Sequence, residues 1–208
     1  MISLRYKKVA ILGAGGHTRS LINLLEYNYF KIVGIFDDNF EISREEFIND
    51  YPLAGKIDNF PKDIAVVLSI GDNYLRAELF RKFKPYVVKD NLIHPKSVIE
   101  KNVILGISNQ ICAYVYINSN VEICDNNIIN TGAIIEHEVK IGYNNHISVN
   151  STLCGRVRIG NNCFIGAGAV VIDKLTIQDD VTIGANSVVI SNIAEAGVYA
   201  GNPARRVK

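Results

Sequence analysis

Aliphatic residues recur at every sixth position through the second half of the chain, beginning at Ile93. Seventeen consecutive positions follow this period, and it ends where Glu195 takes the next place. The positions are Ile93, Ile99, Leu105, Ile111, Ile117, Ile123, Ile129, Ile135, Ile141, Ile147, Leu153, Ile159, Ile165, Val171, Ile177, Ile183 and Val189. Neither the helical period nor the two-residue period of a strand produces such a pattern. A fixed period of six predicts a solenoid of hexapeptide turns, which is a parallel β-helix.

Three six-residue sides would form a triangular coil of 18 residues, with one aliphatic side chain of each side pointing inward. Residues 18 apart are then expected to stack at the ladder spacing of about 4.8 Å. The residue after each aliphatic position is often Gly or Asn, as at Gly106, Asn130 and Gly142. We expect the corners of the triangle in this slot, because these residues accept backbone conformations that larger residues resist.

The first half of the chain lacks this repeat and instead alternates short apolar runs with amphipathic segments. A strand is predicted over Lys8–Leu12, followed by a glycine-rich loop from Gly13 and a helix. A second strand, Lys31–Phe36, ends at an acidic pair, and a third strand is predicted over Ile64–Ile70. This order of elements is typical of a Rossmann-like α/β sheet.

Two domains follow from this change of pattern. We predict a Rossmann-like nucleotide-sugar-binding domain over residues 1–90 and an all-β parallel β-helix with a C-terminal tail over residues 91–208. The segment from Glu41 to Phe60 is predicted to be a loop with a short helix.

Composition changes this picture little. Hydrophobic residues make up 48% of the chain and charged residues 21%, as in ordinary globular proteins, and the net charge is +1. Without a concentrated basic run, nucleic-acid binding is disfavoured. The charged N-terminus and the lack of a long apolar run predict no signal peptide, no membrane insertion and a cytoplasmic location. The four cysteines lack the paired spacing of a zinc site, so we expect reduced structural thiols and no metal.

The glycine-rich loop is a candidate ligand site. Thr18 stands where a dinucleotide fingerprint has its third glycine, so the signal for NAD is weak. A phosphate held by amides at the start of the helix is one alternative, and a tight turn without a ligand is another. Candidate substrate contacts on this edge of the sheet are Gly15, Gly16, His17, Asp37, Asp38, Gly71 and Asn73. The two aspartates could accept hydrogen bonds from a ribose or a base, or they could be solvated turn residues.

His137 is the strongest candidate for chemistry in the solenoid. It lies two residues after the inward position of Ile135 and is expected to face outward. An outward histidine on a solenoid is most often a plain surface residue. However, Glu136 and Glu138 flank this one, and a carboxylate can orient a general base and raise its basicity. One coil further on, Gly155 would leave room for substrate and offer an N–H as an oxyanion donor. The polar pair Asn130 and Thr131 precedes it on the same coil.

His146 is nine residues from His137, which is half a coil. It directly precedes the inward Ile147 and is also expected to face outward. On a rigid triangular prism these two histidines should not share a site within one subunit. They could meet where neighbouring prisms pack side by side, and a ring of three suits a triangular prism. The spacing therefore suggests a homotrimer with sites between subunits.

Several motifs resemble the sugar-nucleotide N-acetyltransferases of the hexapeptide-repeat superfamily, the PglD-like group and its sialic acid O-acetyltransferase relatives. They are Asn130-Thr131, Ile135-Glu136-His137-Glu138, Ile141-Gly142, His146-Ile147-Ser148, Cys154-Gly155, Ile159-Gly160 and Gly201-Asn202-Pro203-Ala204-Arg205. The likeness extends to Gly13–His17 and the acidic pair, and so covers nearly the whole chain. Many relatives have Pro after His-Ile-Ser, where this chain has Val149-Asn150.

The resemblance implies a left-handed β-helix and an acetyl-CoA-dependent transfer to the amine of a UDP-, dTDP- or GDP-linked amino-dideoxy sugar for surface glycan synthesis. It implies that His137 is the general base of a direct attack on the thioester and that Glu138 orients it, beside Gly155. It implies substrate contacts at Asn130 and Thr131. Its implied cofactor contacts are His146, Gly155, Ala167, Gly168, Ala169, Gly184, Ala185, Pro203, Arg205 and Arg206.

Three alternatives remain at this point. O-acetylation of a sialic-acid-type hydroxyl would use the same base. A trimeric scaffold that binds sugar nucleotides without catalysis would not need the Glu-His-Glu run. A zinc hydratase on the same prism needs three histidine ligands, and only two histidines lie in the coils proper.

Overall fold

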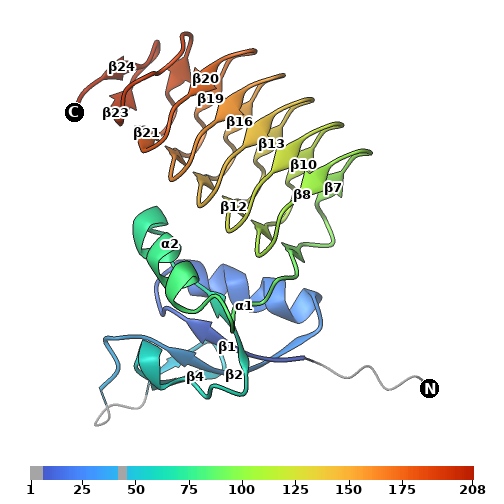
Figure 1. Cartoon of the computed structure of the whole chain (residues 1–208), viewed down its shortest axis with the longest axis vertical. Helices are drawn as coiled ribbons and strands as arrows, with labels where there is room; N and C mark the ends of the chain where they lie inside the picture. Colours follow the sequence, from blue (N-terminus) through green and yellow to red (C-terminus); the bar gives the residue numbers. More distant parts are fainter. Residues whose placement is uncertain (1–6, 42–45) are drawn as a thin grey trace. The chain divides into compact units, whose positions relative to one another are not determined.

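A computed structural model describes residues 7–41 and 46–208 of the chain (Figure 1). The chain divides into two compact units, one ending at Leu92 and the other beginning at Ile93. Each unit has its own buried core, and each is described by itself below. Within the described residues, no helix is both long enough and apolar enough to cross a membrane.

The first unit is a small sheet covered on both faces, and the predicted Rossmann-like pattern is confirmed. Its strands are β1 (Lys7–Leu12), β2 (Phe30–Phe36), β3 (Phe47–Ile48), β4 (Tyr51–Gly55) and β5 (Ala65–Leu68), in the order β3-β4-β2-β1-β5. Its helices are α1 (His17–Tyr27), the 3-10 turn η1 (Ile57–Asn59) and α2 (Asn73–Lys82). β1 runs parallel to both β2 and β5, which brings the carboxyl ends of these strands to one edge.

Alternation along β1 explains why helices cover both faces. Val9 and Ile11 pack with Leu21 and Leu25 of α1, whereas Ala10 and Leu12 belong to the cluster of Leu79 and Phe83. Successive side chains of a strand point to opposite faces, so a strand with no polar positions needs a layer on each side.

The prediction for Glu41–Phe60 was wrong in part. Residues 42–45 lie outside the described residues, but the rest forms β3, β4 and the turn η1. β4 pairs parallel with β2, and β3 pairs antiparallel with β4. The sequence hid β4 because it contains Pro52 and its only large aliphatic residue is Leu53, so it shows no alternation.

The second unit is the predicted β-helix, with three parallel sheets stacked along its sides (Figure 1). One sheet contains β6 (Leu92–Ile93), β9 (Gln110–Ile111), β12 (Ile128–Ile129), β15 (His146–Ile147), β18 (Phe164–Ile165), β21 (Val181–Ile183), β23 (Gly197–Ala200) and β24 (Arg205–Arg206). A second contains β7 (Val98–Ile99), β10 (Tyr116–Ile117), β13 (Ile134–Ile135), β16 (Thr152–Leu153), β19 (Val170–Val171) and β22 (Val188–Val189). The third contains β8 (Ile104–Leu105), β11 (Glu122–Ile123), β14 (Lys140–Ile141), β17 (Arg158–Ile159) and β20 (Thr176–Ile177).

The 18-residue register is confirmed at every paired rung. Ile117 pairs with Ile135, and Ile135 pairs with Leu153. The aliphatic residue at each sixth position is the last residue of its two-residue strand and lies in one continuous core; from Ile111 onward, none of the seventeen is more than 4% exposed. The architecture is that of a left-handed β-helix.

The expectation for the corners was wrong in one respect. The left-handed backbone conformation does not fall directly after the inward aliphatic residue but three residues after it, for example at Asn120 (φ 61°), Glu138 (φ 62°) and Arg156 (φ 62°). The glycines directly after the aliphatic residue have another cause. A Cβ on Gly142 would lie 2.5 Å from the backbone oxygen of Gly160 on the next coil. Glycine is therefore needed there for close stacking of coils rather than for its dihedral freedom.

Each hexad has a second inward position, two residues before the aliphatic one, which the sequence pattern did not reveal. At one corner this position holds the fully buried residues Asn109, Asn127, Asn145 and Cys163. Each side-chain oxygen accepts the backbone N–H of the next residue in this series, at 2.9, 2.8 and 2.7 Å. These bonds satisfy polar atoms inside the prism, where an unpaired group would be costly.

Candidate functional site

The glycine-rich loop joins β1 to α1 at the carboxyl edge of the first sheet. Gly13 has φ 105°, and its N–H donates to Phe36 O at 2.8 Å, which holds the loop against the end of β2. Thr18, which replaces the third glycine of a dinucleotide fingerprint, is fully buried. Its hydroxyl donates to Gly13 O at 3.0 Å and accepts from the Ser69 hydroxyl at 2.9 Å. This threonine therefore ties the loop to the end of β5, a role that glycine could not take.

Gly15, Gly16 and Gly71 face open space. A Cβ built on any of the three would meet nothing within 4 Å, and none of them has a left-handed φ. Neither packing nor backbone geometry explains a glycine at these positions. Small residues at the edge where parallel strands end leave the backbone accessible to a ligand, and the start of α1 favours an anion there.

The two aspartates after β2 are already bonded within the protein. Asp37 accepts Ala14 N–H with one oxygen at 2.8 Å, and the other oxygen accepts from Asn39 N and Nδ2, both at 2.9 Å. Asp38 accepts Ile57 N–H at 3.3 Å. Asp37 thus fixes the glycine-rich loop to the second strand, and its carboxylate has less capacity for a ribose than the sequence suggested.

Arg76 organises the neighbouring loop, and the sequence analysis did not assign it this role. Its side chain is fully buried, and it donates to Ile70 O at 3.1 Å, Gly71 O at 3.3 Å and Asn73 Oδ1 at 2.8 Å. Burial lowers the pKa of the guanidinium to about 10, partly offset by the charge of Asp72. Asn73 is itself buried, so it supports the loop from beneath. His17 begins α1 at the same edge of the sheet.

His137 lies at the corner that follows β13. Its Nδ1 is 3.0 Å from Glu138 Oε2, and both side chains are about half exposed. Its Nε2 has no hydrogen-bond partner among the described residues, so this nitrogen is available to a reactant. The hydrogen bond with His137, and then that with Arg156, lowers the pKa of the Glu138 carboxyl. An ionised carboxylate favours the proton on Nδ1 and leaves the Nε2 lone pair free, as a general base requires.

Gly155 lies directly under the His137 ring. A Cβ there would be 2.7 Å from both Cε1 and Nε2 of the imidazole. The expectation that this glycine leaves room for substrate is therefore corrected, because the ring itself fills the space. Within the part of the chain that the structure describes, the Gly155 N–H donates to no protein acceptor. It remains a candidate oxyanion donor beside the base.

His146 differs from the expectation of a surface residue. It lies in β15 on another side of the prism and is only 8% exposed. Its ring packs edge-on against Phe164, one coil further on, with centroids 5.2 Å apart. The Asn130 Oδ1 accepts Thr131 N–H at 2.8 Å, so the amide nitrogen faces His146 Nε2 at 3.1 Å. Nε2 is then the acceptor, and the structure brings Asn130, Thr131 and His146 together while leaving His137 at a separate corner.

The later coils hold the remaining predicted contacts. Ala167 and Ala185 are exposed at one corner, 18 residues apart, and Gly168 beside them has φ 67°. Gly184 lies at the start of the corner that contains Ala185. The prediction for Ala169 is corrected, because its fully buried side chain occupies the second inward position and points into the core.

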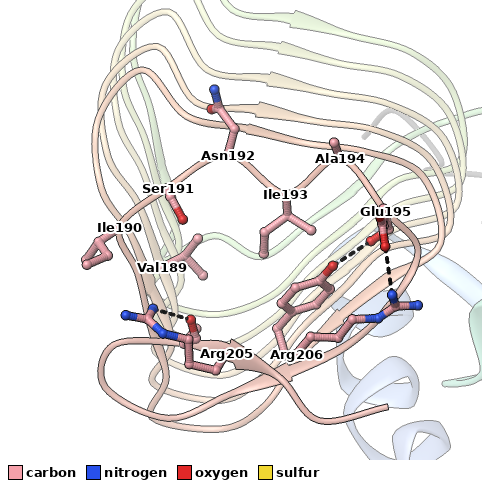
Figure 2. Close-up of a pocket in the computed structure, with 11 residues that line it drawn as sticks. Val189, Ile190, Ser191, Asn192, Ile193, Ala194, Glu195, Arg205 and Arg206 are labelled. Atoms are coloured by element: carbon pink, nitrogen blue, oxygen red, sulfur yellow. Dashed lines mark hydrogen bonds and ion pairs between the residues drawn. The ribbon is translucent and has the colours of Figure 1, made fainter.

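The C-terminal end of the prism contains a cavity of about 580 Å³ (Figure 2). Val189, Ile193 and Tyr199 form apolar walls, and Arg205 and Arg206 approach it from the tail. Arg206 is bound to Glu195 at 2.7 Å, whereas Arg205 donates only to Ala204 O, at 2.9 Å, among the described residues. Arg205 is thus the more available cation. Pro203 lies in the turn between β23 and β24.

No group of three or more metal-ligating side chains that could hold a metal ion occurs in residues 7–41 and 46–208.

Comparison with known proteins adds to this geometry. The PglD N-terminal domain family matches residues 8–83. A search of curated proteins finds no match. Among solved structures, PerB from Caulobacter crescentus in complex with CoA and GDP-perosamine has 32% identity, 97% coverage of both chains and a TM-score of 0.89. A histidine-to-alanine variant of GDP-perosamine N-acetyltransferase from the same bacterium, also with both ligands, has 31% identity, the same coverage and a TM-score of 0.89.

A second similar structure is the acetyltransferase domain of PglB from Neisseria gonorrhoeae in complex with acetyl coenzyme A. It has 26% identity, covers 97% of this chain and 100% of its own, and has a TM-score of 0.87. WeeI from Acinetobacter baumannii, at 21% identity and with a TM-score of 0.79, shares the fold.

Proposed function

The chain belongs to the sugar-nucleotide N-acetyltransferases of the left-handed β-helix superfamily, and from this premise we propose how it acts. It is an acetyltransferase with acetyl-CoA as its co-substrate. Its acceptor is the amine of a nucleotide-linked 4-amino-4,6-dideoxyhexose. A GDP-linked sugar is the first candidate, because the similar structures at 31% and 32% identity contain GDP-perosamine. UDP- and dTDP-linked sugars are the alternatives.

One observation carries the mechanism: an imidazole whose Nδ1 faces a carboxylate at 3.0 Å lies directly over a glycine with an undonated N–H. His137 Nε2 takes a proton from the sugar amine as its nitrogen attacks the thioester carbonyl. The Gly155 N–H donates to the oxygen that becomes negative. When the tetrahedral intermediate collapses, the CoA thiolate leaves and takes the proton from the imidazolium. A single direct attack therefore needs no acetylated residue on the enzyme.

The nucleotide part of the acceptor is assigned to the first unit. The open glycines Gly15, Gly16 and Gly71 support this assignment, since no internal contact requires them. His17 and the loop that contains Asn73 complete this edge. The two aspartates are proposed mainly to shape the loop, because Asp37 already accepts three N–H groups.

Acetyl-CoA is proposed to lie along the later coils. Ala167, Gly168, Gly184 and Ala185 offer small side chains there, and His146 contributes from the adjacent subunit. The nucleotide end of CoA is assigned to the region of Pro203, Arg205 and Arg206, where Arg205 can bind a phosphate. In this arrangement Asn130 and Thr131 stand beside His146.

A homotrimer is proposed because one outer face of the prism is apolar. On the β7–β22 side, Val98 is 50% exposed and Ile134 38% exposed, and Tyr116, Val170 and Val188 continue the same column. The outer column of the β8–β20 side instead holds Glu122, Lys140 and Arg158. The corner of His137 adjoins the apolar side, so packing prisms through it would place this histidine between subunits. Light scattering should give three times the 23.0 kDa chain mass.

The substrate assignment is tested with a panel of acceptors. GDP-, UDP- and dTDP-linked 4-amino-4,6-dideoxyhexoses are each incubated with the protein and acetyl-CoA, and CoA release is followed with a thiol reagent. Mass spectrometry should show one added acetyl group on at least one acceptor. A free sialic acid serves as the hydroxyl acceptor. Turnover of the sialic acid alone would overturn the amine assignment, and no turnover of any acceptor would support a binding scaffold instead.

A further inference from the structure

We propose that Arg156 is a positioning residue for the pair of His137 and Glu138, holding the Glu138 carboxylate ionised and aimed at the imidazole. This inference rests on the proposed function, in which His137 is the base. Arg156 Nε donates to Glu138 Oε2 at 3.1 Å, and His137 Nδ1 meets the same oxygen at 3.0 Å. One carboxylate oxygen is therefore shared between the proposed base and a permanent cation.

The backbone places these side chains together. Glu138 and Arg156 are 18 residues apart and hold the same left-handed conformation, with φ 62° at both. The Arg156 N–H also donates to His137 O at 2.9 Å. Their Cα atoms stand one ladder step of about 4.8 Å apart, and the two side chains leave the corner in the same direction. The guanidinium thus reaches Glu138 as a consequence of the coil register.

The other charged groups near this corner are engaged elsewhere. On the same coil, Glu136 accepts from the Asn118 side chain at 2.7 Å. One coil beyond Arg156, Lys174 is paired with Asp173 at 3.5 Å. One coil before Glu138, the corner residue is the uncharged Asn120. Of the described residues, Arg156 is therefore the Lys or Arg that contacts the Glu138 carboxylate.

The electrostatic consequence follows from this arrangement. After the hydrogen bond with His137, contact with Arg156 is the next cause that lowers the pKa of Glu138. Glu138 contributes an oriented imidazole only while it is ionised, so its contribution is lost as the pH falls through its own pKa. Without Arg156, that loss would begin at a higher pH. Ion pairs that are half exposed are weak, so we expect an effect on catalysis with little effect on folding.

The test compares Arg156→Ala and Arg156→Lys with the matched control Arg158→Ala. Arg158 is an exposed arginine on the next strand of the same coil, and removing it changes the net charge equally. Arg156→Ala should lower kcat about twofold to fivefold, with both KM values nearly unchanged. The acid limb of its kcat/KM profile should move to higher pH by about 0.2–0.7 units. Arg156→Lys should recover part of both effects, and Arg158→Ala should match the wild type.

Two outcomes would overturn the proposal. One is an Arg156→Ala profile that matches Arg158→Ala. The other is a raised KM for acetyl-CoA with an unchanged kcat and acid limb, which would make Arg156 a cofactor contact. In a Glu138→Gln background, Arg156→Ala should have almost no further effect on the profile, and a full shift there would also contradict the proposal.

A second measurement separates this inference from the proposed function. The side-chain carboxyl of Glu138 is titrated by NMR in the wild type and in Arg156→Ala, without any substrate. The midpoint should be higher in the variant. Equal midpoints would overturn the role of Arg156 even in an active enzyme. A shifted midpoint in a protein that acetylates no acceptor would instead leave the contact standing and reject the proposed function.

Discussion

The two histidines of the solenoid lie nine residues apart in sequence but occupy opposite kinds of position. His137 stands at a corner, about half exposed, with a carboxylate on one nitrogen and nothing from the described residues on the other. His146 lies within a strand, 8% exposed, between an amide and an aromatic ring. Corners of this fold present side chains to reactants, whereas strands stack them against the next coil. The same residue type can therefore serve chemistry at one position and packing at the other.

The strongest way to break this comparison is to remove the corner histidine. His137→Ala should lower kcat about 10²–10⁴-fold, because no other group can accept the proton of the attacking amine. The free energy of unfolding should change by less than about 0.5 kcal/mol, since the ring is half exposed. Steady-state kinetics and urea unfolding check the two parts. A variant that keeps full activity would contradict the role of the corner.

Gly155 tests the same corner from beneath. Gly155→Ala should lower kcat about 10–10²-fold, because its Cβ would lie 2.7 Å from two atoms of the imidazole and the ring must move. The matched control is Gly142→Ala, whose Cβ would meet the backbone of the next coil. The control should lose thermal stability and retain its rate per folded molecule. If the two variants behaved alike, Gly155 would be a purely structural residue.

Removing the strand histidine should give the converse result. We expect His146→Ala to lower the free energy of unfolding by about 1–3 kcal/mol, because the contact with Phe164 and the bond with Asn130 are both lost. The KM for acetyl-CoA should rise while kcat stays within about tenfold of the wild type. Denaturant titration and kinetics of one preparation measure both. A loss of kcat as large as that of His137→Ala would reverse the assignment of the two histidines.

The smallest effect is expected for the cysteines, which repeat the comparison. Cys163 is fully buried at an inward position, and burial raises the pKa of its thiol to about 12. Cys154 lies directly after a strand, is partly exposed, and has its thiol pKa raised less. Iodoacetamide at pH 8 should label Cys154 first and leave Cys163 unlabelled until the protein unfolds. Equal labelling of the native protein, measured by peptide mass spectrometry, would contradict this difference between inward and corner positions.

The solenoid was predictable because its period is strict. Once Ile135 was placed inward, the register placed His137 at a corner and Gly155 beneath it. The same register brings Arg156 onto Glu138, so an 18-residue step along the corner would have found that contact. What the period could not give was how far each side chain is covered. His146 faces away from the axis, yet Phe164 and Asn130 bury it, and this depends on neighbours that stack rather than on its place in the hexad.

In the first unit the signals were local and weaker. The loop from Gly13 and the strands on either side of it were visible because glycines interrupt continuous apolar runs. β4 was missed because Pro52 breaks its pattern and its pairing with β2 is a tertiary contact. The role of Arg76 was missed for a similar reason. A buried arginine looks like a surface one until the carbonyls that receive its N–H groups are known.

The central claim is that the corner imidazole receives the proton of the acceptor amine. A crystal structure of the protein with CoA and the GDP-linked amino sugar tests it most directly. The account predicts the sugar nitrogen within about 2.6–3.2 Å of His137 Nε2, with the CoA sulfur on the Gly155 side of the ring. A sugar amine bound away from this corner, with His137 facing only solvent, would contradict it.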